Sequence, residues 1–224
     1  GAVMPAEQIE KLIKLADQYD FILASDECYS ELYPDESQPP VGLLEVCARM
    51  GRDDYKRCIV FHSLSKRSNL PGMRSGFIAG DADIIAQFKL YRTYHGSAMS
   101  PVVQAASVAA WGDEAHVVDN RNLYRTKFAQ VTPVLAEVLD VKLPDASFYL
   151  WAGVPEGWQG DDAAFAKARY EKEHVTVLPG SYLARDFNGF NPGRGRVRMA
   201  LVAETAECLE AAERIARFVR QHPR

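Results

Sequence analysis

Four side chains with complementary chemistry lie within the segment "SLSKRSNLPGMR", residues 63–74. Lys66 carries an amine that is normally protonated and a poor nucleophile, until desolvation or a nearby cation lowers its pKa and lets it condense with an aldehyde. The hydroxyls of Ser63 and Ser65 and the guanidinium of Arg74 are donors that suit a phosphate monoester. The segment therefore indicates a ligand that is both an aldehyde and a phosphate.

The neighbouring segments narrow this ligand to pyridoxal 5′-phosphate. The apolar stretches 21–25 and 57–63 are typical of buried strands, and α/β proteins bind ligands at the carboxyl ends of their strands. Asp26 follows the first stretch, where a carboxylate could keep a pyridine nitrogen protonated and make the ring an electron sink. Tyr29 could reach the ring's phenolic oxygen. Taken alone, Asp26 is equally well explained as a cap on the next turn, and Lys66 as a solvated charge.

Composition excludes several other classes of protein. The chain has 224 residues, 47% of them hydrophobic and 25% charged, which is typical of a folded globular protein. The 26 basic and 30 acidic residues give a net charge of −4, which argues against a nucleic-acid-binding protein. No apolar run approaches the roughly 18 residues of a membrane helix, and no signal peptide is visible. Four scattered cysteines favour reduced thiols in a cytoplasmic protein over disulfides or a zinc site, so no metal site is expected.

The first half of the chain alternates helical and strand patterns, which indicates an α/β layer fold. Helices are expected over 4–20, 41–50, 81–94 and 100–111, and buried strands over 21–25, 57–63 and 75–80.

After Trp111 the pattern changes to a smaller α+β unit. Helices are expected over 113–139, 161–174 and 205–222, and strands over 146–154, 175–180 and 195–202. The boundary between the two parts is placed near Asn120, inside the long helix.

Three segments, in the order "SDECYSELY", "SLSKRSNLPGMRSGFIAGD" and "GRVRMALV", resemble fold-type I aminotransferases of the aspartate aminotransferase superfamily. The resemblance extends over essentially the whole chain. It implies an α/β fold of the pyridoxal-phosphate-dependent transferase type. Residues 1–120 would be the C-terminal part of the large mixed-sheet domain that binds the cofactor, and 121–224 the smaller α+β domain at the C-terminus.

The resemblance also implies a role for each candidate residue. Lys66 would be the catalytic lysine that forms the Schiff base with pyridoxal 5′-phosphate and carries the proton. Asp26 would pair with the pyridinium nitrogen, and Tyr29 would hydrogen-bond to the ring oxygen O3′. The remaining cofactor contacts, to the phosphate, would come from Ser63, Ser65 and Arg74.

Arg198, in the segment "RVRMA", matches the arginine that binds the substrate α-carboxylate in this superfamily. Without the resemblance, it would be interpreted as a surface charge at a strand edge. The implied reaction is transamination between an amino acid and a 2-oxo acid, in a homodimer.

Within the superfamily, the chain most resembles the proteobacterial N-succinyldiaminopimelate aminotransferases, which act in lysine and diaminopimelate synthesis with glutamate as amino donor. Such a substrate carries carboxylates beyond the one that Arg198 would hold, and a buried carboxylate needs a cation. Arg67, Arg92 and Arg185 are candidates for that cation, although each could equally be a solvated surface charge.

Other interpretations of the chain remain open. Members of the superfamily are longer, and "GAVMPAEQ" resembles the text that follows an Asn-Pro-Thr-Gly turn inside them, so the chain is expected to be a fragment that lacks an N-terminal region. A pyridoxal-phosphate-dependent C–S lyase of the same fold is one alternative. A non-catalytic aminotransferase-like segment is another, although the intact set of candidate residues argues against it.

Overall fold

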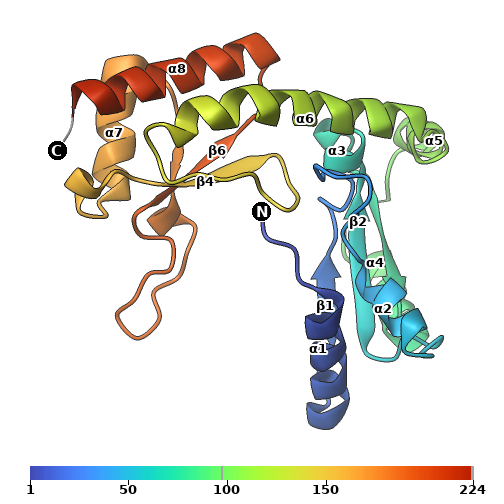
Figure 1. The fold of residues 1–224 in the computed structure, drawn as a ribbon. Helices are drawn as coiled ribbons and strands as arrows, with labels where there is room; N and C mark the ends of the chain where they lie inside the picture. Colours follow the sequence, from blue (N-terminus) through green and yellow to red (C-terminus); the bar gives the residue numbers. More distant parts are fainter. Residues whose placement is uncertain (97, 223–224) are drawn as a thin grey trace. The chain divides into compact units, whose positions relative to one another are not determined.

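The computed structural model describes residues 1–96 and 98–222. These form two compact units (Figure 1). The N-terminal unit spans residues 2–121, and the C-terminal unit contains Gly1 and the residues from 122 onward. Helix α6, Ala115–Ala136, begins in the first unit and continues into the second.

A three-stranded mixed sheet organises the N-terminal unit (Figure 1). Its strands are β1 (Leu23–Asp26), β2 (Cys58–Ser63) and β3 (Gly76–Gly80), in the spatial order β1-β2-β3. β1 runs parallel to β2, whereas β3 runs antiparallel to it. β2 is therefore the central strand, and its carboxyl end leads directly into the segment that contains Lys66.

Helices connect these strands close to the positions that the sequence predicts. They are α1 (Ala6–Tyr19), α2 (Leu43–Arg49), α3 (Leu64–Arg67), the 3₁₀-helix η1 (Pro71–Met73), α4 (Ala82–Tyr94) and α5 (Pro101–Trp111). Side-chain caps define where two of them begin. Asp81 accepts hydrogen bonds from the backbone N–H groups of the first turn of α4, and Ser100 caps α5 in front of Pro101.

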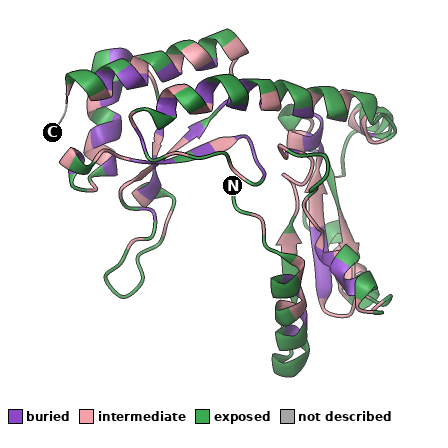
Figure 2. Cartoon of the chain, in the orientation of Figure 1, coloured by how far each residue is buried: buried purple, intermediate pink, exposed green. Residues whose placement is uncertain are grey.

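The apolar faces of α1 and α2 pack against β2 and form the core of this unit. The buried residues come from both helices and the strand: Ile9, Ile13, Leu43, Val46, Cys47, Cys58 and Val60. Figure 2 shows the contrast with α5, which is largely exposed and buries only Ser107. The spacing of apolar residues that predicted α1 thus corresponds to the face that enters this core.

The prediction of a fully buried strand over residues 21–25 is wrong. Phe21 and Ile22 precede the strand and are 39% and 56% exposed, and the residues of β1 itself alternate between half-buried and exposed. The reason is topological, because β1 lies at the edge of the sheet and pairs only with β2 in the described residues. An apolar run alone does not distinguish an edge strand from a central one.

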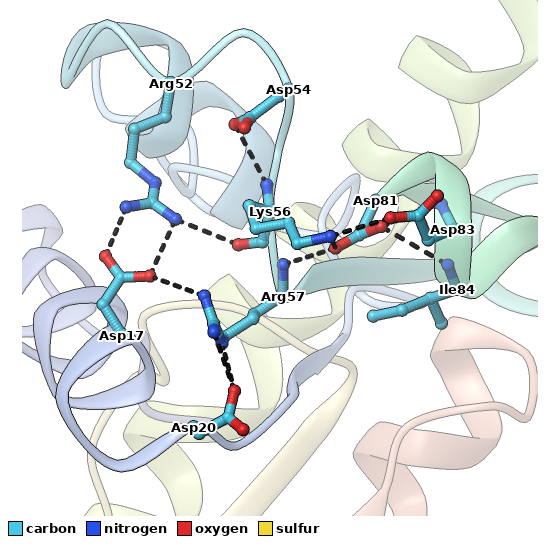
Figure 3. Close-up of polar contacts among 9 residues, drawn as sticks. All are labelled: Asp17, Asp20, Arg52, Asp54, Lys56, Arg57, Asp81, Asp83 and Ile84. Atoms are coloured by element: carbon cyan, nitrogen blue, oxygen red, sulfur yellow. Dashed lines mark hydrogen bonds and ion pairs between the residues drawn. The ribbon is translucent and has the colours of Figure 1, made fainter.

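A network of ion pairs and hydrogen bonds joins α1, the segment before β2 and the start of α4 (Figure 3). The Arg52 guanidinium pairs with Asp17, and Arg57 bonds to Asp20 at 2.9 Å from Nε and 2.7 Å from Nη2. Asp81 is 3% exposed and accepts the Arg57 backbone N–H at 2.7 Å, a bond that helps to lower the pKa of this carboxyl. Exposed ion pairs contribute little to the stability of a fold. Asp81 is therefore the important member of the network, because it fixes the turn into α4.

The C-terminal unit contains a second, antiparallel sheet with the spatial order β4-β6-β5. Its elements are β4 (Tyr149–Gly153), η2 (Glu156–Trp158), α7 (Asp162–Glu173), β5 (Leu178–Pro179), η3 (Gly180–Tyr182), β6 (Arg196–Ala200) and α8 (Thr205–Gln221). The strand expected over 175–180 is only two residues long. It ends at Pro179, directly before Gly180, where a Cβ would lie 2.3 Å from the Gly193 carbonyl oxygen, so the backbones approach too closely for any other residue.

The core of this unit contains an unusual buried cation. Aromatic contacts join Phe165 on α7 to Trp158 and to Phe218 on α8. On the same face of α7, one turn beyond Phe165, Arg169 is 0% exposed. No hydrogen-bond partner for its three guanidinium nitrogens is found among the described residues. Burial lowers the pKa of Arg169 to about 10.

All four cysteines are free thiols. Cys47 and Cys58 are fully buried in the core of the N-terminal unit, and burial, reinforced by a bond to Cys47, raises the pKa of Cys58 to about 12. Across the described part of the chain, no helix combines the length and the apolar character that crossing a membrane requires.

Candidate active site

The register of β1 against β2 determines where the candidate residues meet. Asp26 lies opposite Phe61, and the Glu27 backbone N–H continues the ladder by donating to the Phe61 carbonyl oxygen at 2.9 Å. Because the two strands are parallel, the segments that leave them begin at the same edge of the sheet. The structure thereby places the turn that contains Tyr29 beside the turn that contains Lys66, as expected for a ligand site at the carboxyl ends of strands.

Two serines begin the short helix that carries Lys66. Ser63 is the N-cap of α3, and its hydroxyl accepts the Ser65 backbone N–H at 3.0 Å. The two hydroxyl oxygens are 2.8 Å apart, and Ser63 Oγ also donates to the Ser75 carbonyl oxygen at 3.2 Å. The serines predicted to bind phosphate are thus neighbours in space and already hydrogen-bonded to each other. A phosphate oxygen would replace a bond between hydroxyls with a charge-assisted one.

Lys66 is half-buried, and its Nζ lies 5.9 Å from the centroid of the Tyr29 ring. This separation is within the range of a cation–π contact. The ring therefore lies beside the amine, on the side of the segment that follows β1. An aldehyde that reacted with Lys66 would meet the Tyr29 ring and hydroxyl in the same region.

Asp26 is exposed, and its Oδ1 accepts the Cys28 backbone N–H at 3.1 Å. This is the local capping bond that the sequence allowed as an alternative. The bond uses one carboxylate oxygen and orients the group at the carboxyl end of β1. Burial together with the hydrogen bond to Asp26 raises the pKa of the Cys28 thiol to about 11, which favours its protonated form at neutral pH.

Arg74 occupies an uncommon backbone conformation. It follows η1 with φ 51° and ψ 38°, in the left-handed region that disfavours residues with a Cβ. Its side chain is exposed, and Nη1 donates to the Pro71 carbonyl oxygen at 2.9 Å. The segment then returns to the sheet at Gly76, where a Cβ would lie 2.3 Å from the His62 carbonyl oxygen.

Sequence reasoning missed a polar pair below this edge of the sheet. The Glu27 carboxylate accepts the Leu43 backbone N–H at 2.8 Å and lies 3.1 Å from His62 Nε2. His62 in turn stacks on Phe77, with 5.0 Å between the ring centroids. The pair joins the turn after β1 to the start of α2 and to β2. The spacing of these residues in the sequence gives no signal for it, because they are brought together only by strand pairing.

This pair predicts a pH effect on stability. Burial raises the pKa of Glu27, but its hydrogen bonds together outweigh burial and bring the pKa below its usual value of 4.5. A carboxyl with a lowered folded pKa stabilises the fold above its unfolded pKa, and this contribution is lost as the pH falls through the folded value. We therefore expect Glu27→Gln to lower the urea midpoint at neutral pH, and the difference from the unmodified protein to shrink below about pH 4.5.

Glu45→Gln is the matched control, since Glu45 is an exposed carboxylate paired with Arg49. It should leave the midpoint nearly unchanged at both pH values. An equal loss for Glu27→Gln at neutral and acidic pH would contradict the assignment of the effect to the ionised carboxylate.

Arg198 belongs to the C-terminal unit and lies at the middle of β6. Its Cα partners are Trp151 on β4 and Leu178 on β5. The guanidinium is half-buried and stacks over the Tyr149 ring, 4.4 Å from the centroid. The stacking keeps the planar fork in one orientation, which suits bidentate binding of a carboxylate.

A family model for "Aminotransferase class I and II" matches residues 1–215. The chain belongs to this family. Its members depend on pyridoxal phosphate, so the aldehyde phosphate indicated by the Lys66 segment is the cofactor of the family. The family match and the mixed-sheet fold confirm the predicted superfamily and fold class.

Three relatives show how this aminotransferase chain compares with known proteins. A crystal structure of an aminotransferase from Neisseria meningitidis has 55% sequence identity and a TM-score of 0.91, over 97% of this chain and 54% of that one. An LL-diaminopimelate aminotransferase from Nitratidesulfovibrio vulgaris is 36% identical over 96% of this chain and 53% of its own length. A probable N-succinyldiaminopimelate aminotransferase from Thermus thermophilus has 29% identity and a TM-score of 0.82, over 97% and 55%. The chain thus spans about half the length of the relatives it matches.

The three arginines considered for a distal carboxylate differ in how far the aminotransferase chain already uses them. Arg67 is 7% exposed, pairs with Glu114 and donates to the Ala110 carbonyl oxygen at 3.0 Å. Arg92 donates to the His95 carbonyl oxygen at 3.3 Å on the exposed end of α4, and Arg185 is exposed. Because Arg67 is committed to internal contacts, Arg92 and Arg185 are the better candidates.

Proposed function

We propose that the chain carries the Lys66 half of a pyridoxal-phosphate-dependent aminotransferase that acts on a diaminopimelate derivative. The observation that carries the proposal is the placement of Lys66 beside Tyr29 at the carboxyl ends of β1 and β2, in a chain of the class I and II family. The proposed enzyme is a cytoplasmic homodimer that exchanges the amino group between an amino acid and a 2-oxo acid.

The donor set of the site fits the cofactor. Ser63, Ser65 and Arg74 offer two hydroxyls and a guanidinium, which are the donors that a phosphate dianion requires. Asp26 presents a carboxylate at the end of β1, and Tyr29 a phenol beside the amine. When bound, the cofactor supplies an aldehyde and a ring that accepts electrons from the substrate.

Each residue then has a defined task. The Lys66 amine would hold the aldehyde of the cofactor and, when free, would accept the proton of the substrate α-carbon. Asp26 keeps the ring nitrogen protonated, because a carboxylate nearby favours the charged form of that nitrogen. Tyr29 donates to the ring oxygen. Arg198 binds the substrate α-carboxylate through its fork, in the orientation that stacking on Tyr149 provides.

For the substrate, we propose N-succinyldiaminopimelate, with glutamate and 2-oxoglutarate as the second pair. The relatives support a diaminopimelate skeleton, since one acts on LL-diaminopimelate and another is named for the succinylated form. Both compounds carry a carboxylate far from the reacting carbon, and they differ in whether the distal amine is charged or blocked.

Steady-state kinetics of the purified protein tests this proposal. kcat/KM is measured with 2-oxoglutarate and three amino donors: N-succinyl-LL-diaminopimelate, LL-diaminopimelate and aspartate. We expect the succinylated compound to be preferred by about tenfold or more, since a site built for a polar group discriminates against substrates that leave it unpaired. Preference for LL-diaminopimelate would support a substrate with the diaminopimelate skeleton but overturn the assignment of the succinyl group. Preference for aspartate would overturn both, and pyruvate released from cystathionine would indicate a lyase.

The two ligand-binding arginines should respond differently to substitution. Arg74→Ala is expected to weaken binding of pyridoxal 5′-phosphate by roughly 10- to 100-fold, because a charge-assisted contact to phosphate contributes about 1.5–3 kcal/mol. Arg198→Ala should leave cofactor binding unchanged and raise KM for every amino donor. Cofactor Kd by absorbance titration and KM by initial rates measure the two effects. If Arg198→Ala loses the cofactor and keeps its KM, the two roles have been misassigned.

A further inference from the structure

The helix that carries Lys66 is too short to hold its own shape. α3 has four residues, Leu64–Arg67, which is scarcely one turn, and isolated turns are unstable because nucleation fixes several residues for one hydrogen bond. Three groups of contacts reach it from the segment between the end of α5 and the first turns of α6. This segment, residues 110–120, is called the α5–α6 corner below. It lies entirely within the N-terminal unit.

The first contact is made by Asn120. Its side-chain amide donates to the Lys66 carbonyl oxygen at 3.1 Å and to the Arg67 carbonyl oxygen at 3.5 Å. Carbonyl groups in the last turn of a helix lack partners within the helix. Asn120 therefore caps α3 from a distant part of the chain, and one of its two acceptors is the backbone of the catalytic lysine.

The second contact holds the neighbouring side chain. The Arg67 guanidinium lies over the Trp111 ring, 4.9 Å from its centroid, donates to the Ala110 carbonyl oxygen at 3.0 Å and pairs with Glu114. Arg67 is 7% exposed, so these contacts are made largely out of water. A desolvated and fully engaged arginine at this position fixes the backbone that it shares with Lys66.

The third contact is a chain of hydrogen bonds from Asp113 through His116 to Ser68. His116 Nδ1 lies 2.8 Å from the Asp113 carboxylate, and Nε2 lies 2.8 Å from Ser68 Oγ. These atoms connect in the order of a nucleophilic triad, but the burial is reversed: Ser68 is 8% exposed, whereas Asp113 is half exposed. In a catalytic triad the aspartate is the buried member and the serine must reach substrate. The chain therefore positions Ser68, the C-cap of α3, and does not activate it as a nucleophile.

We propose that the α5–α6 corner is the device that positions Lys66, with Asn120 and His116 as its positioning residues. The inference deepens the proposed function and rests on it for the role of Lys66, but the geometry of α3 can be tested separately. Loss of either residue should release the end of α3 while the sheet below it remains folded.

The first experiment measures how often the backbone turn of α3 opens. The Ser68 and Leu70 N–H groups both donate to the Leu64 carbonyl oxygen, at 3.1 and 3.2 Å, and so report on closure of the turn. Hydrogen exchange resolved to these amides is compared in the unmodified protein, Asn120→Ala and His116→Phe. We expect exchange to be at least about tenfold faster in both variants, since about 1.4 kcal/mol of local opening free energy corresponds to a factor of ten. Asn122→Ala is the matched control, because Asn122 contacts Arg125 on the same helix.

The second experiment measures the reactivity of the Lys66 amine and does not depend on turnover. The protein is mixed with limiting pyridoxal 5′-phosphate, reduced with borohydride and digested, and the label on Lys66 is compared with the label on the exposed Lys11. The Lys66 amine joins the aldehyde carbon with loss of water, and hydride from borohydride completes a stable secondary amine. We expect the ratio of labels to fall about tenfold or more in Asn120→Ala and His116→Phe, and to stay unchanged in Asn122→Ala. His116→Gln, whose amide can still donate and accept, should recover part of the loss.

The outcomes distinguish failure of the proposed function from failure of the positioning role. If Lys66 of the unmodified protein is not labelled in preference to Lys11, the proposed function fails, and the exchange data alone decide whether the corner holds α3. If Lys66 is labelled but neither exchange nor labelling changes in the two variants, the positioning role is overturned. A general loss of protection in β2 as well as α3 would likewise overturn it, because it would show a stabilising role for the whole unit.

Discussion

Replacing Lys66 with alanine is expected to abolish measurable transamination while the fold persists. Removing the group proposed to transfer the proton should alone lower kcat by about 10²- to 10⁴-fold. Loss of the covalent link to the cofactor adds to this effect. The side chain is half-buried at the end of the sheet and makes no contribution to the apolar core, so the thermal midpoint should change little. Initial rates and thermal unfolding of the same preparation measure both quantities.

Lys56→Ala provides the control for this substitution. Lys56 is also a lysine of the N-terminal unit, but it pairs with Asp83 on the surface, at 2.8 Å. Its loss should leave turnover unchanged. Turnover by Lys66→Ala at the rate of the unmodified protein, or recovery of the borohydride-reduced label on another lysine, would remove the central element of the proposed function.

Replacing Arg169 with leucine is expected to stabilise the C-terminal unit. Arg169 is fully buried, and its guanidinium finds no hydrogen-bond partner among the described residues. An ionised group in such a place loses its hydration without compensation, and even paired buried ions are often improved by 1–4 kcal/mol when apolar residues replace them. We expect a gain of at least about 1 kcal/mol in the free energy of unfolding, measured by urea titration with a probe in the C-terminal unit.

Arg217→Leu is the contrasting control. Arg217 is half exposed and pairs with the buried Glu173 carboxylate on the same face of α7 as Arg169, so its removal should leave that carboxylate unpaired and lower stability. If Arg169→Leu is destabilising instead, the expectation of an uncompensated charge is wrong, and a bound anion is one explanation to test. A search for bound anions by native mass spectrometry would then follow.

The fold was largely predictable because most of its elements are encoded locally. Ser100 and Pro101 indicate the start of α5, and the apolar spacing of α1 predicts the face that enters the core. The errors arose where the burial or length of a strand depends on its position in the tertiary structure. The segment at β1 has the composition of a buried strand but lies at a sheet edge, and the strand expected over 175–180 pairs with β6 only at Leu178 and Pro179.

The sequence indicated candidate residues for the site but not the residues that hold them in position. Lys66, Asp26 and Tyr29 follow strands and are therefore placed at one edge by the topology alone. Their proposed roles remain predictions that the experiments above address. The contacts of Asn120 and His116 with α3 join residues about fifty positions apart, and neither residue type is unusual at the start of a helix. The burial of Arg169 could not be predicted for a related reason, because the sequence of a helix with mixed polarity does not show which of its charged residues faces the core.

At position 74, the proposed function and the stability of the fold favour different residues. Its left-handed backbone would be occupied more favourably by glycine, and the conformation costs a residue with a side chain about 1 kcal/mol. A stability-guided redesign of this loop would therefore choose glycine at position 74, and it would remove the guanidinium proposed to bind phosphate. If Arg74 binds phosphate as proposed, a glycine at this position in a related sequence would give a less strained turn and weaker cofactor binding.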